Sequence, residues 1–141
     1  MEKKNIHTAK FPQLSYNMYG KGDVIVLLHG FPLDSSLWDK IVPTLAEDYL
    51  VIVPDLPGSG KSTFEGNELS IDEMAESVRL ILVKEQVNKV VLAGHSMGGY
   101  VALAFADLYP DAVKGLALVH SSARSDTEEK KRAKVEIHRA V

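Results

Sequence analysis

The chain has 141 residues, which is enough for one domain with a buried core. Hydrophobic residues make up 45% and charged residues 25% of the sequence, the usual balance of a soluble globular protein. The net charge of -3 argues against nucleic acid or an anionic membrane surface as a partner. The absence of cysteine excludes disulfides, thiolate metal sites and a cysteine nucleophile, and we expect neither metal nor cofactor. No stretch has the pattern of a secretory signal or a membrane span, so we expect a cytoplasmic protein.

Five segments have the pattern of β-strands. Residues 14–19 alternate between apolar and polar side chains, which indicates a strand with one buried face. Four other runs are almost wholly apolar, as in parallel strands covered on both faces: residues 24–28, 50–53, 90–93 and 113–119.

Helices are expected between these strands. Ser70 and Glu73 form a good capping box ahead of an amphipathic helix, and a third helix runs from the residue after Ser96 to Pro110. An earlier helix is expected to start at Ser36, where Asp39 completes a weak capping box. Its predicted buried face consists of Trp38, Ile41, Val42 and Leu45.

Strands that alternate with helices predict an α/β fold, a mostly parallel sheet with helices on both faces. Ligands bind such sheets at the carboxyl ends of the strands. The loops at that edge carry His29, the glycine loop 55–62, Ser96 and His120. The predicted architecture therefore gathers the unusual residues of the sequence on one side.

Ser96 stands at a corner between the strand 90–93 and the following helix. Gly94 and Gly98 flank it at two residues on either side, which leaves room for a sharp turn and for close packing of strand and helix. Such a turn exposes the serine in a strained backbone conformation, and the start of the helix offers free N–H groups to an oxyanion. The pattern predicts that Ser96 is a catalytic nucleophile.

An oxyanion hole needs two donors that approach from different directions. The N–H of Met97 can supply one, and the N–H of Phe31 is the natural second because Gly30 lets its loop approach closely. His29 is expected to make structural hydrogen bonds and not to act as the base.

The other candidate groups favour simpler interpretations. The run Gly58–Ser62 lacks the first glycine of a phosphate loop, where Asp55 stands instead, and two prolines remove N–H donors, so nucleotide binding is rejected. His120 is a candidate pocket residue, although a surface histidine explains it somewhat better, and a dyad of Ser96 with His120 is improbable. His95 is a further candidate pocket residue, as the variable position of the turn. The acidic residues after Ser125 are better explained by capping and a solvated helix face.

Together these pieces resemble the α/β-hydrolase fold family, in its branch with a cap inserted after the sixth strand. The matching segments are His29-Gly30-Phe31-Pro32, residues 55–62, and Gly94-His95-Ser96-Met97-Gly98-Gly99. The resemblance implies that Ser96 is the nucleophile and that the N–H groups of Phe31 and Met97 form the oxyanion hole. It also argues against the dehalogenase and epoxide-hydrolase branches, which look similar but carry aspartate at the position of Ser96.

The resemblance also implies a departure from the family. Family members carry the triad acid and histidine on loops after later strands, and no residue of this chain matches either. We therefore expect the N-terminal part of a longer serine hydrolase, truncated after the sixth strand, with the core in residues 1–122 and the start of a cap helix in residues 123–141. The expected substrate is a small ester-like molecule that forms an acyl-enzyme at Ser96. The alternative is an inactive fragment that binds the missing C-terminal segment, another partner or a copy of itself.

Overall fold

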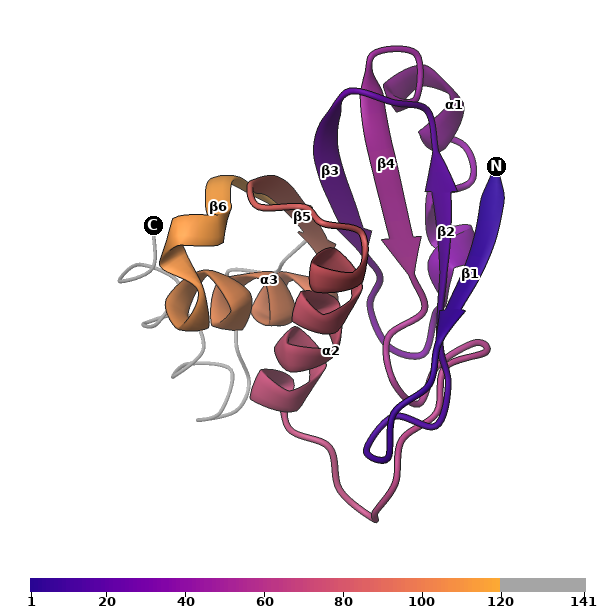
Figure 1. The fold of residues 1–141 in the computed structure, drawn as a ribbon, viewed down its shortest axis with the longest axis vertical. Helices are drawn as coiled ribbons and strands as arrows, with labels where there is room; N and C mark the ends of the chain where they lie inside the picture. Colours follow the sequence, from indigo (N-terminus) through magenta and orange to yellow (C-terminus); the bar gives the residue numbers. More distant parts are fainter. Residues whose placement is uncertain (120–141) are drawn as a thin grey trace.

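A six-stranded sheet forms the centre of the computed structural model, which describes residues 1–119 (Figure 1). Its strands are β1 (Glu2–Ile6), β2 (Leu14–Tyr19), β3 (Asp23–Leu28), β4 (Tyr49–Pro54), β5 (Val90–His95) and β6 (Val113–Val119). They lie in the order β1-β2-β4-β3-β5-β6. The first two pairings, β1 with β2 and β2 with β4, are antiparallel, and the remaining three are parallel. The predicted α/β fold with a mostly parallel sheet is confirmed.

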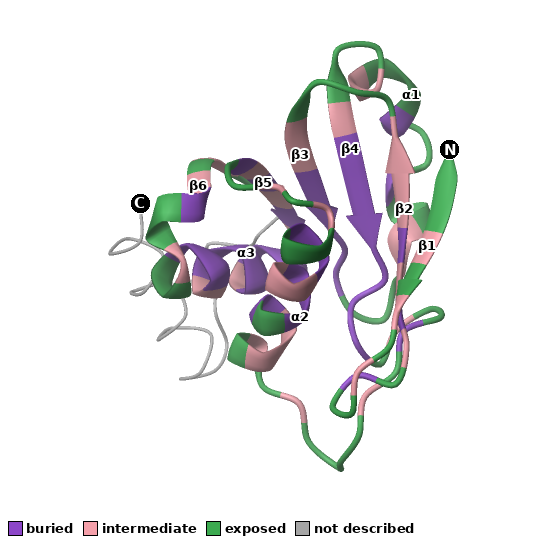
Figure 2. Cartoon of the chain, viewed as in Figure 1, coloured by how far each residue is buried: buried purple, intermediate pink, exposed green. Residues whose placement is uncertain are grey.

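The parallel strands at the centre explain the apolar runs of the sequence. β3 pairs with β4 on one side and with β5 on the other, and Val26, Leu27 and Leu28 are all buried. Side chains of alternate residues point to opposite faces of a strand, so a run buried throughout must be covered on both faces. Figure 2 shows that burial concentrates in this central part of the sheet.

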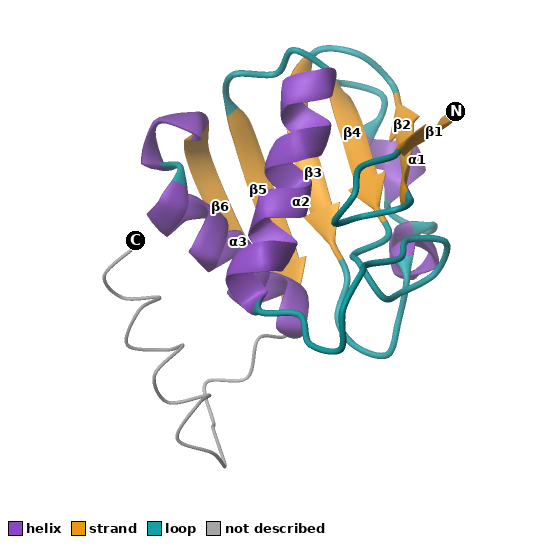
Figure 3. Ribbon diagram, turned by 60° about the horizontal axis from the view of Figure 1, so that its bottom comes forward, coloured by secondary structure: helices purple, strands orange, loops and turns teal. Residues whose placement is uncertain are grey.

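Helices α2 (Ile71–Lys84) and α3 (Met97–Leu108) cover one face of the sheet (Figure 3). The Ser70 hydroxyl accepts the N–H of Glu73, and the Glu73 carboxylate accepts the N–H of Ser70, as the capping box predicts. Val78, Ile81 and Phe105 from these helices belong to the larger of two apolar cores. After α3, the 3-10 helix η2 (Pro110–Ala112) leads into β6.

The opposite face is covered by the 3-10 helix η1 (Ser35–Trp38) and the short helix α1 (Val42–Leu45). The prediction of a helix capped by Ser36 was wrong. Asp34 is the cap, because its carboxylate accepts both the N–H and the hydroxyl of Ser36. Ile41 was also misplaced, since it is 44% exposed, whereas Trp38 and Val42 are buried against the sheet as expected.

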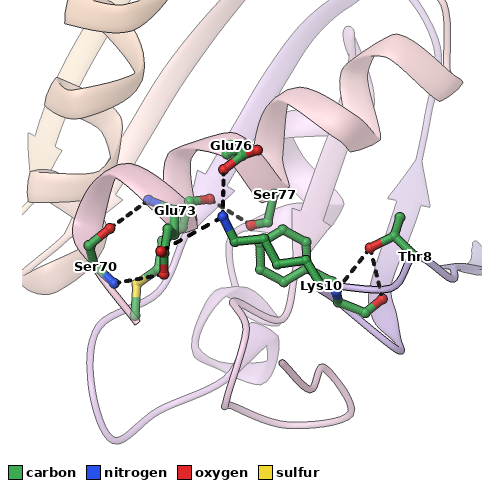
Figure 4. A network of polar contacts seen from close by, with 8 residues as sticks. Thr8, Lys10, Ser70, Glu73, Glu76 and Ser77 are labelled. Atoms are coloured by element: carbon green, nitrogen blue, oxygen red, sulfur yellow. Dashed lines mark hydrogen bonds and ion pairs between the residues drawn. The ribbon is translucent and has the colours of Figure 1, made fainter. Parts of the chain in front are cut away.

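The predicted strand at residues 14–19 is β2, and it forms an N-terminal hairpin with β1, an edge strand that the sequence did not predict. The hairpin is joined to α2 by side-chain contacts: Lys4 pairs with Glu85 at 3.0 Å, and Tyr16 donates a hydrogen bond of 2.6 Å to the same carboxylate. In the loop between the two strands, Lys10 lies 3.0 Å from Glu76 and 3.7 Å from Glu73 (Figure 4). The loop thus contacts α2, and both strands contact Glu85, the residue that caps the C-terminal end of this helix.

Several expectations concern residues that the structure does not describe. The charge-rich helix after Ser125, the proposed start of a cap at residues 123–141 and His120 all lie outside residues 1–119. Within residues 1–119, no helix is long and apolar enough to cross a membrane.

Candidate active site

Ser96 occupies the junction between β5 and α3. Its φ of +54° and ψ of -114° place it in a backbone conformation that non-glycine residues rarely adopt, and it is exposed. Gly99 N–H donates to the Ser96 carbonyl at 2.9 Å, so the helix begins directly at the serine. This is the strained, outward turn that the sequence predicts at this position. A strained residue at the end of a central strand is typical of a functional site.

The two flanking glycines are required by backbone contacts. A β-carbon at Gly94 would meet the carbonyl of Gly98 and would lie 2.5 Å from the nitrogen of Gly99. A β-carbon at Gly98 would meet the carbonyl of Leu28 and lie 2.7 Å from the oxygen of His29. Because these neighbours are backbone atoms of β3 and α3, they cannot move aside as a flexible side chain could. The turn is therefore open only to glycine at both positions.

The loop after β3 lies directly against this turn. A β-carbon at Gly30 would stand 3.0 Å from the β-carbon of Ser96 and 3.0 Å from both the carbonyl oxygen and Nδ1 of His95. Phe31 follows, with its side chain 74% exposed. Within residues 1–119, the N–H groups of Phe31 and Met97 donate to no protein acceptor. One of these N–H groups lies in the loop after β3, next to Gly30, and the other is on the first residue of α3, next to Ser96.

His29 is fully buried and both of its ring nitrogens are occupied. Nε2 lies 2.9 Å from the N–H of Leu56 and must accept that hydrogen bond. The proton therefore sits on Nδ1, which lies 2.9 Å from the Gly30 carbonyl and donates to it. A ring held in this way has no nitrogen left to take a proton from Ser96. It joins the loop after β3 to the loop after β4.

The glycine loop 55–62 is bonded to itself. The N–H of Gly58 donates to Ser62, that of Ser59 to Leu56, and that of Ser62 to Ser59, all through backbone carbonyls. A phosphate-binding loop needs such N–H groups to be free and convergent, so the rejection of nucleotide binding agrees with the geometry.

The role of Asp55 was missed at the level of sequence. Its carboxylate is 8% exposed and accepts two backbone N–H groups, from Ser35 at 2.9 Å and Lys61 at 3.0 Å. Gly60, with a φ of +52°, leaves no room for a β-carbon beside this carboxylate. The available signal was a single acidic residue directly after a wholly apolar strand, followed five residues later by glycine.

The histidines of residues 1–119 lie at different places around the fold. The Ser96 hydroxyl makes no hydrogen bond to a described side chain, and His7 lies in the N-terminal hairpin, where Nδ1 is 2.8 Å from the carbonyl oxygen of Pro12. His95 is the last residue of β5 and lies beside Gly30, while His120 is outside the described part. In the same described range, no group of three acidic, histidine or cysteine side chains could hold a metal ion.

Comparisons with known proteins agree with this geometry. The sequence profile of the family described as alpha/beta hydrolase fold matches residues 23–136. This match covers most of the chain, including the loop after β3, the glycine loop and the Ser96 turn. The chain belongs to the α/β hydrolase fold family.

Individual relatives add detail. A pimeloyl-[acyl-carrier protein] methyl ester esterase of Yersinia enterocolitica is 40% identical over 111 residues, 78% of this chain and 41% of that protein. The structure of a thermophilic esterase from Thermogutta terrifontis matches with a TM-score of 0.81 and 37% identity, over 94% of this chain and 50% of that one. The epoxide hydrolase CorEH matches with a TM-score of 0.76 and 29% identity, over 93% and 49%. The chain thus spans between 41% and 50% of the length of these relatives.

Proposed function

We propose that this chain carries the nucleophile and the oxyanion hole of a serine hydrolase that acts on carboxylic esters. The Ser96 oxygen attacks the ester carbonyl while its proton passes to a base, and the N–H groups of Phe31 and Met97 stabilise the tetrahedral oxyanion. Collapse of that intermediate releases the alcohol, which takes up the proton, and leaves an acyl-enzyme. Water then attacks the acyl-enzyme and releases the carboxylic acid.

The observation that carries the proposal is the conformation of Ser96 beside Gly30. Ser96 is exposed at the start of a helix, with a φ of +54°, and it lies in van der Waals range of a second loop that has a free N–H. Such a conformation costs free energy and is typical of functional sites. The esterase names among the relatives support the same chemistry.

A serine favours esters over epoxides on chemical grounds. Attack of Ser96 on an epoxide would leave an alkyl ether, which water does not cleave under mild conditions. Attack on an ester leaves an acyl-serine, which the same oxyanion hole can help to hydrolyse. The similarity to an epoxide hydrolase is therefore attributed to the shared fold.

The base and the acid that complete the site are proposed to lie beyond residue 119. His29 has no free nitrogen, and His7 lies in the N-terminal hairpin with Nδ1 2.8 Å from the Pro12 carbonyl oxygen. A serine without its base and orienting acid keeps only a small part of its catalysis.

Hydrolysis of a chromogenic ester by the whole protein tests the proposal. Ser96→Ala is expected to lower kcat by roughly a thousandfold or more, because the nucleophile is lost while the fold is kept. Ser36→Ala, which changes another exposed serine, is the matched control and should keep its activity. Undiminished hydrolysis by Ser96→Ala would remove Ser96 from the mechanism.

A further inference from the structure

We propose that Asp55 is a positioning residue for the oxyanion hole, which it holds by joining the loop after β3 to the glycine loop. The proposal rests on the function assigned to Phe31 above. Asp55 touches neither Ser96 nor the oxyanion site in this account. It acts through the backbone of Ser35, and so determines where the N–H of Phe31 lies.

The first step is the double acceptance by the Asp55 carboxylate. One oxygen accepts the N–H of Ser35, which lies 20 residues before Asp55, and the other accepts the N–H of Lys61, which lies 6 residues after it. One side chain thus connects the loop after β3 to the glycine loop. Hydrogen bonds to an ionised carboxylate are stronger than neutral ones, particularly where water is excluded. The buried carboxylate is therefore a firm connection between the two loops.

The second step is the anchoring of the glycine loop to the sheet. Asp55 N–H donates to the Ser15 carbonyl at 2.9 Å, and the Ser15 N–H donates to the Ser62 hydroxyl at 2.8 Å. Ser15 belongs to β2, so both ends of the loop are bonded to one residue of a strand. Asp55 consequently connects Ser35 to a glycine loop that is itself fixed to the sheet.

The third step concerns the short segment between the two attachments. On one side, His29 is held by Leu56 of the glycine loop, and on the other side Ser35 is held by Asp55. Between them, Leu33 N–H closes a turn by donating to the Gly30 carbonyl at 2.9 Å. Phe31 lies inside this turn. Its N–H position therefore depends on both attachments, and both lead to the glycine loop.

This arrangement predicts an effect on the transition state. A donor displaced by a fraction of an ångström still allows a neutral substrate to bind, but it stabilises the oxyanion poorly. Loss of the Asp55 connection should therefore lower kcat and leave KM nearly unchanged. A residue that only stabilised the fold would lower the amount of active protein, so kcat is calculated per folded enzyme, and on that basis a purely structural role would leave kcat at the wild-type value.

Two variants test the connection in the whole protein. Asp55→Asn keeps the shape of the side chain but replaces one of the two carboxylate oxygens by an NH2 group, which cannot accept a backbone N–H. Ser35→Pro removes the N–H donor together with the serine hydroxyl, and Ser35→Ala, which removes the hydroxyl alone, is its control. Ser35 is the first residue of η1, where proline is tolerated, and Asp34 before it is extended with φ -144° and ψ -168°. If Asp55→Asn does not fold, Ser35→Pro still tests the same hydrogen bond.

The matched control is Asp34→Asn. Asp34 lies in the same loop and also accepts a backbone N–H, but its partner is Ser36 and it has no bond to the glycine loop. We expect Asp55→Asn to lower kcat by roughly tenfold to a hundredfold with KM within about threefold, and Ser35→Pro to act in the same direction. Asp34→Asn should stay within about twofold of wild type, because asparagine caps a helix as well as aspartate.

Amide hydrogen exchange over residues 30–35 supplies a readout that does not depend on activity. It should be faster in Asp55→Asn and unchanged in Asp34→Asn, with residues 71–84 as an internal reference. Wild-type kcat together with wild-type exchange in Asp55→Asn would overturn the inference. If wild-type protein hydrolyses no ester, the proposed function fails, and the exchange rates still decide whether Asp55 positions this loop.

Discussion

The Ser96 turn and the attachment of the N-terminal hairpin to α2 are held by different kinds of contact. At the turn, the limits are set by backbone atoms, since β-carbons at Gly94 and Gly98 would collide with main-chain carbonyls. At the hairpin, the contacts are made by long side chains, such as Lys10 with Glu76, and most of them are exposed to water. The turn accepts only glycine at these two positions, whereas the exposed contacts of the hairpin can be made by many different side chains.

The difference shows where precision is needed in this molecule. Backbone contacts fix the Ser96 turn to within a fraction of an ångström, as an oxyanion hole requires. The attachment of the hairpin to α2 needs no such precision, and flexible ion pairs suffice for it. Substitutions at the Ser96 turn should therefore lower the free energy of unfolding much more than substitutions of the exposed hairpin contacts. The hydrogen bond from the buried Tyr16 to Glu85 is the exception among the hairpin contacts.

The largest effect is expected for Gly98→Ala. Its new methyl group would meet the carbonyls of Leu28 and His29, which belong to β3 and its loop and cannot rotate away. We expect a loss of at least about 3 kcal/mol in the free energy of unfolding, measured with urea. The control is Gly115→Ala in β6, where the nearest atom is a side-chain methyl of Val91 at 3.2 Å. Equal losses in the two variants would show that the turn is no more constrained than an ordinary strand.

Tyr16→Phe tests the buried exception. Tyr16 is 1% exposed and donates its hydroxyl to Glu85, so the substitution removes a hydrogen bond to a charged group. We expect a loss of about 1.5 to 3 kcal/mol in urea unfolding. Tyr49→Phe, on an exposed tyrosine, should change the midpoint little. A Tyr16→Phe variant as stable as wild type would mean that the hairpin gains nothing from this contact.

The same carboxylate predicts a dependence of stability on pH. Burial raises the pKa of Glu85, but hydrogen bonds from Tyr16 and Lys4 outweigh burial and hold the pKa below its ordinary value of 4.5. Since the folded pKa is the lower one, the ionised group stabilises the fold fully above about pH 4.5, and this contribution is lost as pH falls through the folded value. Wild type should therefore lose stability relative to Glu85→Gln as the pH falls from 6 to 3. The loss in unfolding free energy should correspond to the difference between the folded and unfolded pKa of Glu85. A difference that stays constant over this range would contradict the assignment.

Ser96→Gly and Ser96→Ala together measure the backbone strain at Ser96, the proposed nucleophile. Alanine keeps the β-carbon at a φ of +54°, whereas glycine removes it. After allowance for the greater flexibility of glycine in the unfolded chain, we expect Ser96→Gly to be more stable than Ser96→Ala by about 1 kcal/mol. Both variants should be inactive. If Ser96→Ala were the more stable of the two, the turn would carry no strain.

The smallest effect is expected at Lys10. Its ammonium pairs with Glu76 and Glu73 at the surface, where water and salt screen the attraction. Lys10→Met should leave the urea midpoint of unfolding unchanged within error, at both low and high salt. A clear, salt-sensitive loss would show that the surface pairs hold the hairpin in place.

The sequence predicted those elements whose signals are local. The Gly-x-Ser-x-Gly pattern between an apolar strand and an amphipathic helix located the Ser96 turn, and the Ser70 box located the start of α2. Both signals lie within a few residues of the feature they predict, because helix caps and tight turns are made by neighbouring residues. The parallel strands β3, β4 and β5 were likewise recognised from their continuous apolar runs. The expectation that residues 113–119 are covered on both faces was wrong, because β6 lies at the edge of the sheet and its residues are half-buried or exposed.

Features that depend on distant partners were not predicted. β1 is polar and mostly exposed, and it becomes a strand only because β2 lies beside it. The start of η1 was misassigned because Asp34 and Ser36 both have capping side chains, and only the fold decides between them. Asp55 was considered only as an obstacle to phosphate binding, since its partner Ser35 lies 20 residues earlier in the chain.

The most direct test of the account is covalent labelling of the whole protein with a fluorophosphonate, followed by mass mapping of the modified peptide. We predict one adduct, on Ser96, that disappears in Ser96→Ala and persists in Ser36→Ala, because Ser96 stands beside the proposed oxyanion hole and Ser36 does not. No adduct from a sample shown to be folded and complete, or an adduct that survives Ser96→Ala, would contradict the claim that this turn carries the nucleophile.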